Sequence, residues 1–383
     1  MRPKLIRVTT IPFSMSKLLK GQLKFMNNHF DVIGVCSNGP FRIEVEKSES
    51  ICTVGINMTR SITPIKDLYA LWLLYKLFKE ERPLIVHTHT PKAGTLGMIA
   101  AKLAGVEHRL HTVAGLPLLE TKGLKRKLLN LVEKLTYACS TKVYPNSFGL
   151  KSIILENKFT KADKLSVLGK GSSNGIDTNY FKPDIFSQED RRRIRIKTGF
   201  DNHHFVFIYV GRVVTDKGIN ELISAFGKID HKDARLLIVG PFESLLDPLS
   251  PSTLSAIETH PYIKSIGYKE DVRPYLMAAD ALVFPSYREG LPNVVLQAGA
   301  MGLPSIVTNI NGCNEIILDG LNGLIVPPKN PDALHSAMCK LINDPLLITA
   351  LKSQARTLIV NRYGQEYVWK SILDEYKKII GNV

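Results

Sequence analysis

The chain has 383 residues, which suits two or three domains of about 150 residues each. Apolar residues make up 44% and charged residues 22%, a composition that excludes an intrinsically disordered chain and allows a sizeable core. The longest apolar run, Leu68–Tyr75, is too short for a membrane-spanning helix, and the start of the sequence lacks a signal-peptide pattern. Five scattered cysteines form no CxxC pair, so we expect neither a disulfide framework nor a zinc site. This cysteine pattern fits a protein of the reducing cytoplasm best.

The positive charge lies in one half of the chain. The formal total is +15, and residues 1–180 carry 27 Lys and Arg against 13 Asp and Glu, a net of +14. Residues 181–383 carry 23 against 22 and are nearly neutral. A basic half suits an anionic partner such as nucleic acid, anionic lipid or a phosphorylated substrate; a solvated basic surface is the alternative.

The first half alternates short β-branched runs with longer amphipathic stretches. The expected strands are Leu5–Thr9, Asp31–Cys36, Thr53–Asn57, Leu84–His87, Arg109–Val113, Lys142–Tyr144 and Leu165–Leu168. The expected helices are Ser16–Asn28, Lys66–Glu80, Ala93–Ala104, Lys122–Cys139 and Ser147–Glu156. This alternation predicts βαβ units, and the continuously apolar strands predict a parallel sheet covered by helices on both faces.

A segment rich in Gly, Ser, Asn and Asp, Gly171–Asp184, interrupts this alternation and is the expected hinge. The alternation then restarts with strands at Phe205–Val210, Arg235–Val239, Ile263–Ile266, Ala281–Phe284, Ser305–Val307 and Leu324–Val326. We therefore expect an α/β fold with two doubly wound, Rossmann-like domains that face each other across a cleft. The expected bounds are 1–175 for the N-terminal domain and 176–365 for the C-terminal domain, with a C-terminal helix, 366–383, packing back on the N-terminal domain.

The first chemical motif, VGRVVTDKG at 210–218, follows the apolar strand FVFIYV. Gly211 allows a sharp turn, and Arg212 and Lys217 then lie at the carboxyl end of a parallel strand, where such folds bind ligands. Two cations of different shape suit a diphosphate, since Arg offers a planar fork and Lys a compact charge. Two exposed charges before a helix are the structural alternative.

The second motif, SYREGLPNVVLQAG at 286–299, follows the strand ALVFP, and a helix is expected from Asn293 to Leu303. The N–H groups at the start of this helix form an anion site. Glu289 can accept hydrogen bonds from sugar hydroxyls, and Gln297, one turn after Asn293, can bond ribose hydroxyls. A capped helix that only packs is the structural alternative.

These strings, with GCNEIILDGLNGLIVPP at 312–328, resemble the group-1 family of retaining glycosyltransferases of GT-B fold. HTHTPKAGTLGMIAAKLAG, RLHTVAGL and NGIDTNYFKP resemble family positions in the first half and the hinge, so the likeness covers roughly the whole chain. The enzymes it resembles most add sugars to lipid-linked precursors of bacterial surface polysaccharides. The resemblance implies a UDP-sugar donor, a lipid-linked (polyprenyl diphosphate) saccharide acceptor and chemistry without a metal ion or other cofactor.

The resemblance also implies that the domain 1–175 binds the acceptor and the domain 176–365 binds the nucleotide sugar, and it implies roles for particular residues. Arg212 and Lys217 would hold the donor diphosphate and Glu289 the donor sugar. Gly290, Leu291, Pro292, Asn293 and Val294 would line the anion site at the helix start. The family usually has a second Glu where this chain has Gln297, which removes a charge from the ribose contact and keeps its hydrogen-bonding capacity. His111, in LHTVAGL, would lie near the anomeric carbon as a fourth catalytic residue beside Arg212, Lys217 and Glu289; a structural histidine is the alternative.

The expected helix Lys122–Cys139 is the candidate membrane contact. Lys122, Lys125, Arg126 and Lys127 adjoin a series of apolar residues, and a basic amphipathic helix can lie in the interface of anionic lipid. The alternative is a helix whose leucines belong to the core. Together with the charge of the whole half, this pattern predicts a cytoplasmic enzyme bound peripherally to the inner face of the plasma membrane.

Three other function classes are alternatives to sugar transfer. A sugar-nucleotide epimerase fits the same two-domain plan and needs no acceptor. A dinucleotide-dependent oxidoreductase is disfavoured because no GxGxxG follows a predicted strand. A nucleic-acid binder is disfavoured because the basic residues are not interleaved with aromatic ones.

Overall fold

The computed structural model describes residues 2–59, 61, 63–116, 118, 121–243 and 247–381. The last two residues of the expected C-terminal helix segment, 382 and 383, lie outside this description. The chain divides into two compact units. Unit 1 comprises Met1–Gly175 and Gln365–Val383, and unit 2 comprises Ile176–Gly364. The division falls within the Gly-rich segment that interrupts the sequence pattern.

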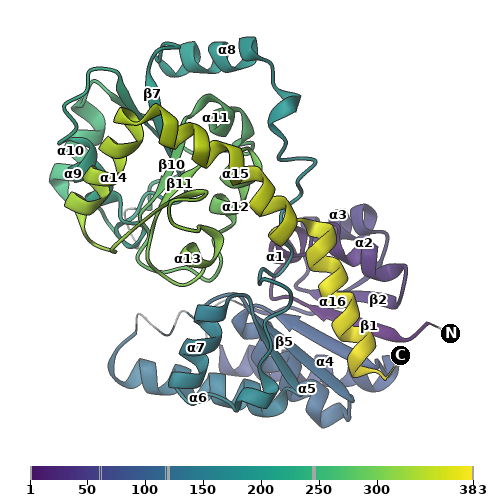
Figure 1. Ribbon diagram of the computed structural model, residues 1–383. Helices are drawn as coiled ribbons and strands as arrows, with labels where there is room; N and C mark the ends of the chain where they lie inside the picture. The colour runs from purple at the N-terminus through teal and green to yellow at the C-terminus, as the bar shows by residue number, and fades with distance from the viewer. Residues whose placement is uncertain are drawn as a thin grey trace. The chain divides into compact units, whose positions relative to one another are not determined.

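Unit 1 is built on a parallel sheet of six strands in the order β3-β2-β1-β4-β5-β6 within the described residues (Figure 1). The strands are β1 (Lys4–Val8), β2 (Asp31–Cys36), β3 (Cys52–Gly55), β4 (Ile85–His89), β5 (His108–Val113) and β6 (Lys142–Pro145). Successive residues of β1 enter different core clusters: Leu5 packs on one face of the sheet, and Ile6 and Val8 pack on the other. Burial on both faces explains why these strands read as continuous apolar runs.

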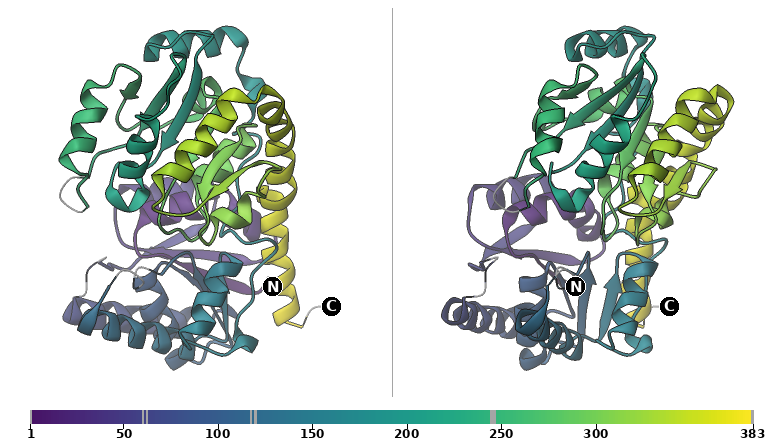
Figure 2. Two further views of the ribbon diagram at one scale, coloured as in Figure 1. Left: turned by 60° about the vertical axis from the view of Figure 1, so that its left-hand side comes forward. Right: turned by 90° about the vertical axis from the view of Figure 1, so that its left-hand side faces the viewer.

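The helices of unit 1 lie on both faces of this sheet (Figure 2). They are α1 (Pro12–Leu18), α2 (Gln22–Asn27), α3 (Pro40–Glu49), α4 (Pro64–Glu81), α5 (Pro91–Ala104), α6 (Gly123–Cys139), α7 (Phe148–Glu156) and α16 (Gln365–Ile379). Although α16 is the last helix in the chain, its Val368, Ile372 and Tyr376 share a core cluster with Leu5 and Leu23. The C-terminal helix is therefore part of unit 1.

Two predictions in unit 1 are wrong. The expected single helix Ser16–Asn28 is two helices, because Gly21 adopts φ +76° between them and ends the regular hydrogen bonding. The expected strand Leu165–Leu168 is a single bridge between Leu165 and Val143, preceded by the 3-10 turn Ala162–Lys164. After that bridge the chain turns back, with Gly171 N–H donating to the Leu168 carbonyl, so no ladder forms.

Unit 2 repeats the plan with a six-stranded parallel sheet, in the order β12-β11-β10-β7-β8-β9 within the described residues. The strands are β7 (Phe205–Val210), β8 (Ala234–Val239), β9 (Ile263–Ser265), β10 (Ala281–Phe284), β11 (Ser305–Thr308) and β12 (Gly323–Val326). The α-helices are α8 (Gln188–Thr198), α9 (Ile219–Phe226), α10 (Pro251–Thr259), α11 (Arg273–Ala278), α12 (Asn293–Ala300), α13 (Cys313–Ile316), α14 (Pro331–Asn343) and α15 (Pro345–Tyr363). Both units therefore have the doubly wound, Rossmann-like architecture expected from the sequence.

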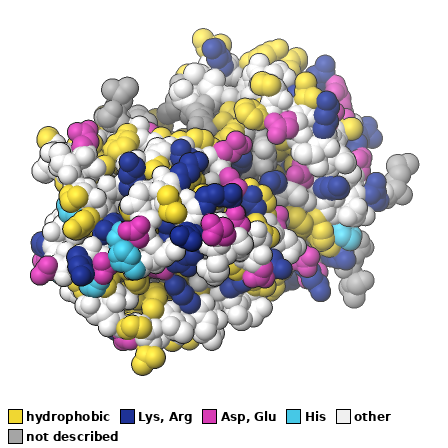
Figure 3. All heavy atoms as spheres, turned by 90° about the horizontal axis from the view of Figure 1, so that it is seen from above, with side chains coloured by type: hydrophobic (Ala, Val, Ile, Leu, Met, Phe, Trp, Pro, Cys, Tyr) yellow, Lys and Arg dark blue, Asp and Glu magenta, His cyan; other side chains and the backbone are white. Residues whose placement is uncertain are grey.

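Among the described residues, no helix combines the length and the apolar character needed to cross a bilayer. Basic and acidic side chains are interspersed on the face of the molecule drawn in Figure 3.

Candidate functional site

The two sequence motifs of unit 2 meet at the carboxyl ends of neighbouring strands. The first motif follows β7 and the second follows β10, and these strands pair in parallel through Phe207 and Ala281. The chain continues from β7 to β8 on one side of the sheet and from β10 to β11 on the other. The carboxyl ends of β7 and β10 therefore flank the topological switch point, where open α/β sheets bind their ligands.

Glycines let the loops at this edge approach one another. Gly218 has φ +70°, and a Cβ there would lie 2.1 Å from the carbonyl oxygen of Pro285. Gly240 follows β8 with φ +156°, and a Cβ there would lie 1.7 Å from the carbonyl oxygen of Gly211. Larger residues at these positions would push the cation-bearing loop after β7 away from the loops that follow β8 and β10.

At the centre of the site, Lys217 and Glu289 form an ion pair between the two motifs. Lys217 Nζ lies 2.5 Å from Glu289 Oε1, and the Ser286 hydroxyl donates to the same oxygen at 2.9 Å. Asn311 Nδ2 donates to the Glu289 carbonyl, which holds the backbone of this loop. Lys217 also lies 5.9 Å from the centroid of the Phe284 ring. Both charged side chains are about 15% exposed, so each charge is largely removed from solvent and is compensated by the other.

Arg212 is held at the same edge by two carboxylates. Its Nη1 donates to Glu243 Oε2 at 2.9 Å, and its Nη2 lies 3.8 Å from Asp216 Oδ2. The Tyr209 hydroxyl donates to the Arg212 carbonyl at 2.6 Å and fixes the turn after β7. Burial alone would lower the pKa of Arg212, but the Glu243 hydrogen bond and the nearby acidic charges outweigh burial and raise the pKa. Arg212 thus stays a cation, and its side chain is 41% exposed and accessible to a ligand.

The structure adds a third cation that the sequence reasoning did not select. Arg288 Nη2 lies 2.9 Å from Asp216 Oδ2, so Asp216 is shared by Arg288 and Arg212. Burial lowers the pKa of Arg288, and the charge of Glu289 opposes this shift. Arg288 stands within the second motif, and its place between Tyr287 and Glu289 was the available signal. Its pairing with a residue of the first motif depends on the fold.

The cations of this edge are therefore paired with carboxylates. Lys217 meets Glu289, Arg212 meets Glu243, and Arg288 meets Asp216. An anionic ligand would exchange these carboxylates for its own oxygens. Such an exchange keeps each buried charge compensated, so a diphosphate can bind without leaving a desolvated cation alone.

Helix α12 begins beside these ion pairs and its start is not capped by a side chain. Pro292 is the N-cap residue, Asn293 is exposed and Val294 is half-buried. The first N–H groups of a helix have no acceptor within the helix and carry the positive end of its dipole. Leu291 is buried, and the Gly290 carbonyl would lie 2.2 Å from a Cβ at Gly312. The approach to the helix is thus fixed by packing, and its first N–H groups remain available to an anion.

Gln297 lies one turn further along α12 and is half-buried. Its position on the same helix as Asn293 agrees with the spacing read from the sequence. The expected helix end at Leu303 is three residues too long, because Met301 ends the regular structure and Gly302 adopts φ +75°.

His111 belongs to unit 1, on β5, and is 3% exposed. Its Nδ1 lies 2.8 Å from the Thr88 hydroxyl, and its ring fills the space beside Gly94, where a Cβ would lie 2.3 Å from His111 Cε1. Burial lowers the pKa of His111 to about 4, against the opposing effect of Thr88. The imidazole is therefore neutral near pH 7 and can offer a hydrogen bond but no positive charge.

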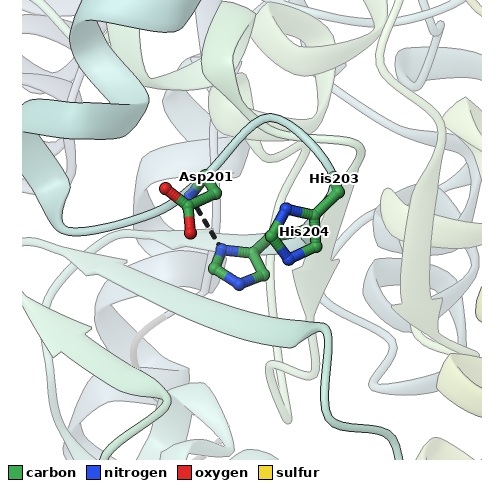
Figure 4. Close-up of side chains that lie close together, drawn as sticks. All are labelled: Asp201, His203 and His204. Atoms are coloured by element: carbon green, nitrogen blue, oxygen red, sulfur yellow. Dashed lines mark hydrogen bonds between the residues drawn. The ribbon is translucent and has the colours of Figure 1, made fainter.

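Two other groups of neighbouring histidines, one in each unit, are poor metal sites. Asp201, His203 and His204, in the loop before β7, place their ligand atoms within 4.8 Å of one another (Figure 4). Both ring nitrogens of His204 are already engaged, since Nδ1 accepts from the Asp201 N–H at 2.8 Å and Nε2 lies 2.6 Å from Arg235 Nη2. A cationic neighbour at that distance opposes a metal ion, so this cluster is a poor site.

His87 and His89 stack in unit 1 with ring centroids 4.4 Å apart. His89 Nε2 lies 2.8 Å from Nη2 of the buried Arg7, and His87 bonds the hydroxyls of Thr112 and Tyr376. Burial and the Arg7 charge lower the pKa of His89 well below its usual value. The fixed guanidinium makes this pair unfavourable for a metal ion as well.

Comparison with known proteins agrees with this architecture. The family model described as "Glycosyl transferases group 1" matches residues 204–344, and the one described as "Glycosyl transferase 4-like" matches residues 13–147. The capsular polysaccharide biosynthesis glycosyltransferase CapM of Staphylococcus aureus is 33% identical over 98% of this chain and 97% of its own. The chain belongs to the group 1 glycosyl transferases.

One further sequence relative and one solved structure are similar to this group 1 glycosyl transferase over nearly its whole length. The UDP-Gal:alpha-D-GlcNAc-diphosphoundecaprenol alpha-1,3-galactosyltransferase of Escherichia coli is 31% identical over 93% of this chain and 91% of its own. The crystal structure of a glycosyltransferase from Rickettsia africae superposes with a TM-score of 0.81, at 22% identity, over 100% of both chains. The latter likeness supports the GT-B fold, with two Rossmann-like domains in one chain.

The predicted site residues of this group 1 glycosyl transferase fall into two sets. Arg212, Lys217, Glu289 and the residues from Gly290 to Gln297 come together at one edge of unit 2. His111 belongs to the other compact unit, unit 1. Glu243, Asp216 and Arg288 complete the charged set, and the sequence reasoning missed them because their partners lie on separate loops.

Proposed function

We propose that this glycosyltransferase transfers a hexose or N-acetylhexosamine, with retention of anomeric configuration, from a UDP-sugar to a polyprenyl diphosphate-linked saccharide. The product would be a precursor of a bacterial surface polysaccharide. The observation that carries the proposal is the juxtaposition of Lys217, Glu289 and Arg212 with the uncapped start of α12. The names of the S. aureus and E. coli relatives support the pathway, the donor class and the acceptor class.

The donor diphosphate would bind to Arg212 and Lys217 and to the backbone N–H groups of Asn293 and Val294. Glu289 would be released from Lys217 by the diphosphate and would accept hydrogen bonds from the donor sugar. After this exchange the diphosphate oxygens would compensate the two cations, and the sugar hydroxyls would donate hydrogen bonds to the Glu289 carboxylate. No charged group would then lack a partner. Gln297 would contact the ribose from the next turn of α12, as a neutral donor and acceptor.

Transfer would break the bond between the anomeric carbon and the β-phosphate oxygen. The acceptor hydroxyl would form the new bond to that carbon from the same side, and the departing phosphate would take the hydroxyl proton. Arg212, Lys217 and the dipole of α12 would stabilise the charge that develops on the leaving diphosphate. This scheme needs no covalent bond to the protein, because the acceptor hydroxyl itself attacks the anomeric carbon. It needs no metal ion, because the fixed cations would neutralise the leaving diphosphate.

His111 would lie near the anomeric carbon. A neutral imidazole suits this place, because the developing oxocarbenium ion is positive and a protonated histidine would repel it. The low pKa of His111 supports this role.

We also propose that the enzyme acts in the cytoplasm, bound peripherally to the inner face of the plasma membrane. The basic N-terminal half supports attraction to anionic lipid, and a polyprenyl-linked acceptor would reside in that membrane. Helix α6 supports this because its Leu124, Leu128, Leu131 and Leu135 are exposed and are therefore not core residues.

The direct test is a panel of nucleotide sugars incubated with a polyprenyl diphosphate-linked sugar, with the product identified by its mass shift. We expect one UDP-sugar to add one sugar residue to the acceptor, in the presence of a metal chelator as well as in its absence. Conversion of the nucleotide sugar without any acceptor would overturn the proposal.

A further inference from the structure

Helix α4 presents apolar side chains on two faces. Ala70, Leu74 and Phe78, spaced four residues apart, are at most 1% exposed and belong to the core beneath the sheet of unit 1. This inner stripe is sufficient to hold the helix against the domain.

The opposite face of α4 is also apolar, and it is exposed to solvent. Ile65, Leu68, Tyr69 and Trp72 are 87%, 68%, 62% and 54% exposed. They follow the spacing i, i+3, i+4, i+7 of a helix face that packs against a partner. With two more residues of α4, Leu71 and Tyr75, and with Leu103 of α5, they line an open groove of about 840 Å³. We call this lining surface the α4 outer face. The Tyr69 and Trp72 rings stack with centroids 6.0 Å apart.

An exposed apolar surface of this extent is uncommon on a protein that acts alone in water, and it marks a site of interaction. Isolated apolar residues on a surface need no explanation, but contiguous residues at helix-packing spacing do. The α4 outer face therefore lacks the partner that would cover it.

The charges around the α4 outer face indicate what the partner is. Each carboxylate of α4 lies within 4.0 Å of a lysine, in the pairs Asp67–Lys92, Glu80–Lys76 and Glu81–Lys4. In contrast, exposed Lys66, Lys79 and Lys102 make no ion pair with any described residue. The net charge available to a partner is positive, and Lys66 and Lys102 are the chain neighbours of Ile65 and Leu103, which line the groove.

The neighbouring helices extend the same pattern. Helix α5 packs between α4 and α6, and Figure 1 shows the three helices in one layer of unit 1. Helix α6 carries exposed leucines at 124, 128, 131 and 135, spaced four, three and four residues apart, with exposed Lys125, Lys127 and Lys134 among them.

We propose that the α4 outer face is the part of the enzyme that enters an anionic phospholipid bilayer. Its aliphatic side chains would reach the acyl boundary, Tyr69 and Trp72 would lie at the level of the headgroups, and the unpaired lysines would bind lipid phosphates. The lysines of α4 and α5 that lack a carboxylate partner among the described residues favour an anionic lipid surface as the occupant. The inference rests on the proposed peripheral membrane association and names the surface that makes it.

Sedimentation of the full-length protein with vesicles tests this proposal. Vesicles of phosphatidylglycerol mixed with phosphatidylcholine should bind the wild type, and vesicles of phosphatidylcholine alone should bind it more weakly. The double variant Leu68→Asn/Trp72→Gln should weaken binding to the anionic vesicles about tenfold or more, because it removes two large apolar groups from the interface. The matched control is Leu346→Asn/Tyr268→Gln, which changes one leucine and one aromatic residue that are 84% and 69% exposed on unit 2. The control should bind like the wild type.

Trp72 provides a second readout, because the chain has two tryptophans and the other, Trp369, donates a hydrogen bond to Asn174 within unit 1. Brominated lipid in the anionic vesicles should quench the fluorescence of the wild type and should lose most of this effect in Trp72→Phe. Equal quenching in both proteins, or full binding by the Leu68→Asn/Trp72→Gln variant, would overturn the proposal. A dimer that this variant converts to a monomer would also overturn it, since a second copy would then cover the groove.

The test separates this inference from the proposed reaction. Vesicle binding requires neither donor nor acceptor, so the inactive variant Glu289→Ala should still bind anionic vesicles. If the wild type transfers sugar but α4 variants bind vesicles normally, the inference fails and the proposed reaction stands. If the α4 outer face binds vesicles but no nucleotide sugar supports transfer, the proposed reaction fails.

Discussion

Lys217 and Glu289 stand 72 residues apart in the chain, and their side chains meet at 2.5 Å across the ends of two neighbouring strands. A lysine suits a phosphate and a carboxylate suits sugar hydroxyls, so under the proposed function the pair would contact both chemical parts of a nucleotide sugar. In the absence of ligand each group satisfies the other. The ion pair therefore compensates two mostly buried charges, and in the proposed reaction the donor would take over both contacts.

Replacing either partner should remove activity and leave the fold intact. Lys217→Ala and Glu289→Ala should each lower kcat/KM by about 100-fold or more, since each deletes a charged contact to the donor. Both variants should still unfold cooperatively, with a loss of stability of about 3 kcal/mol, because one partner of a mostly buried ion pair is left uncompensated. Steady-state kinetics and calorimetry check both values, and wild-type-like turnover in both variants would remove the site assignment.

Arg288 should contribute to donor binding, although it was not among the site residues predicted from the sequence. Arg288→Ala should raise the KM for the donor about tenfold, because a cation next to Asp216 is lost. Arg193→Ala, a change on exposed α8 away from this edge, is the control and should leave the KM unchanged. If both variants have the wild-type KM, Arg288 only anchors Asp216.

Gln297 should tolerate a carboxylate. Gln297→Glu keeps the length and one acceptor oxygen of the side chain and replaces its NH2 donor with a second acceptor, so the protein should fold and retain activity, with at most a changed donor affinity. Titration calorimetry with UDP measures that affinity. A variant that fails to fold would show that Gln297 is a core residue and would contradict a ribose contact.

His111 should make the protein sensitive to acid. Its pKa is lowered from 6.5 to about 4 by burial, so the unfolded chain binds more protons between these values and stability falls as the pH drops through this window. Above pH 6.5 the effect is absent, and below about pH 4 it reaches about 3 kcal/mol. His111→Asn should show a smaller loss of stability than the wild type in urea unfolding followed across this range. His87 and His89 act in the same direction, so part of the acid sensitivity should remain.

The strands of both sheets could be predicted from the sequence to within two residues at each end, although the predicted strand Leu165–Leu168 is only a bridge. Phe205–Val210 and Ala281–Phe284 have their predicted bounds because strands buried on both faces must be apolar throughout. Helix α3 was not predicted, since its exposed, charged sequence FRIEVEKSE has a weak apolar pattern, and the break between α1 and α2 depends on the backbone of Gly21 alone.

The site was predictable in part, for a related reason. Each motif shows which side chains stand at a strand end, and parallel topology then brings neighbouring strand ends together. The carboxylate partner of each cation is decided by loop packing, so Glu243 and Asp216 carried no readable signal. The exposure of the outer face of α4 could not be predicted either. A helix that is apolar on two faces has the same sequence pattern whether its second face is buried or exposed to solvent.

The most direct test of the central claim is a crystal structure of the enzyme with UDP bound. The β-phosphate oxygens should lie about 3 Å from Lys217 Nζ and Arg212 and from the N–H groups of Asn293 and Val294, with Glu289 displaced from the lysine. A diphosphate bound elsewhere, with the Lys217–Glu289 pair intact, would contradict the account.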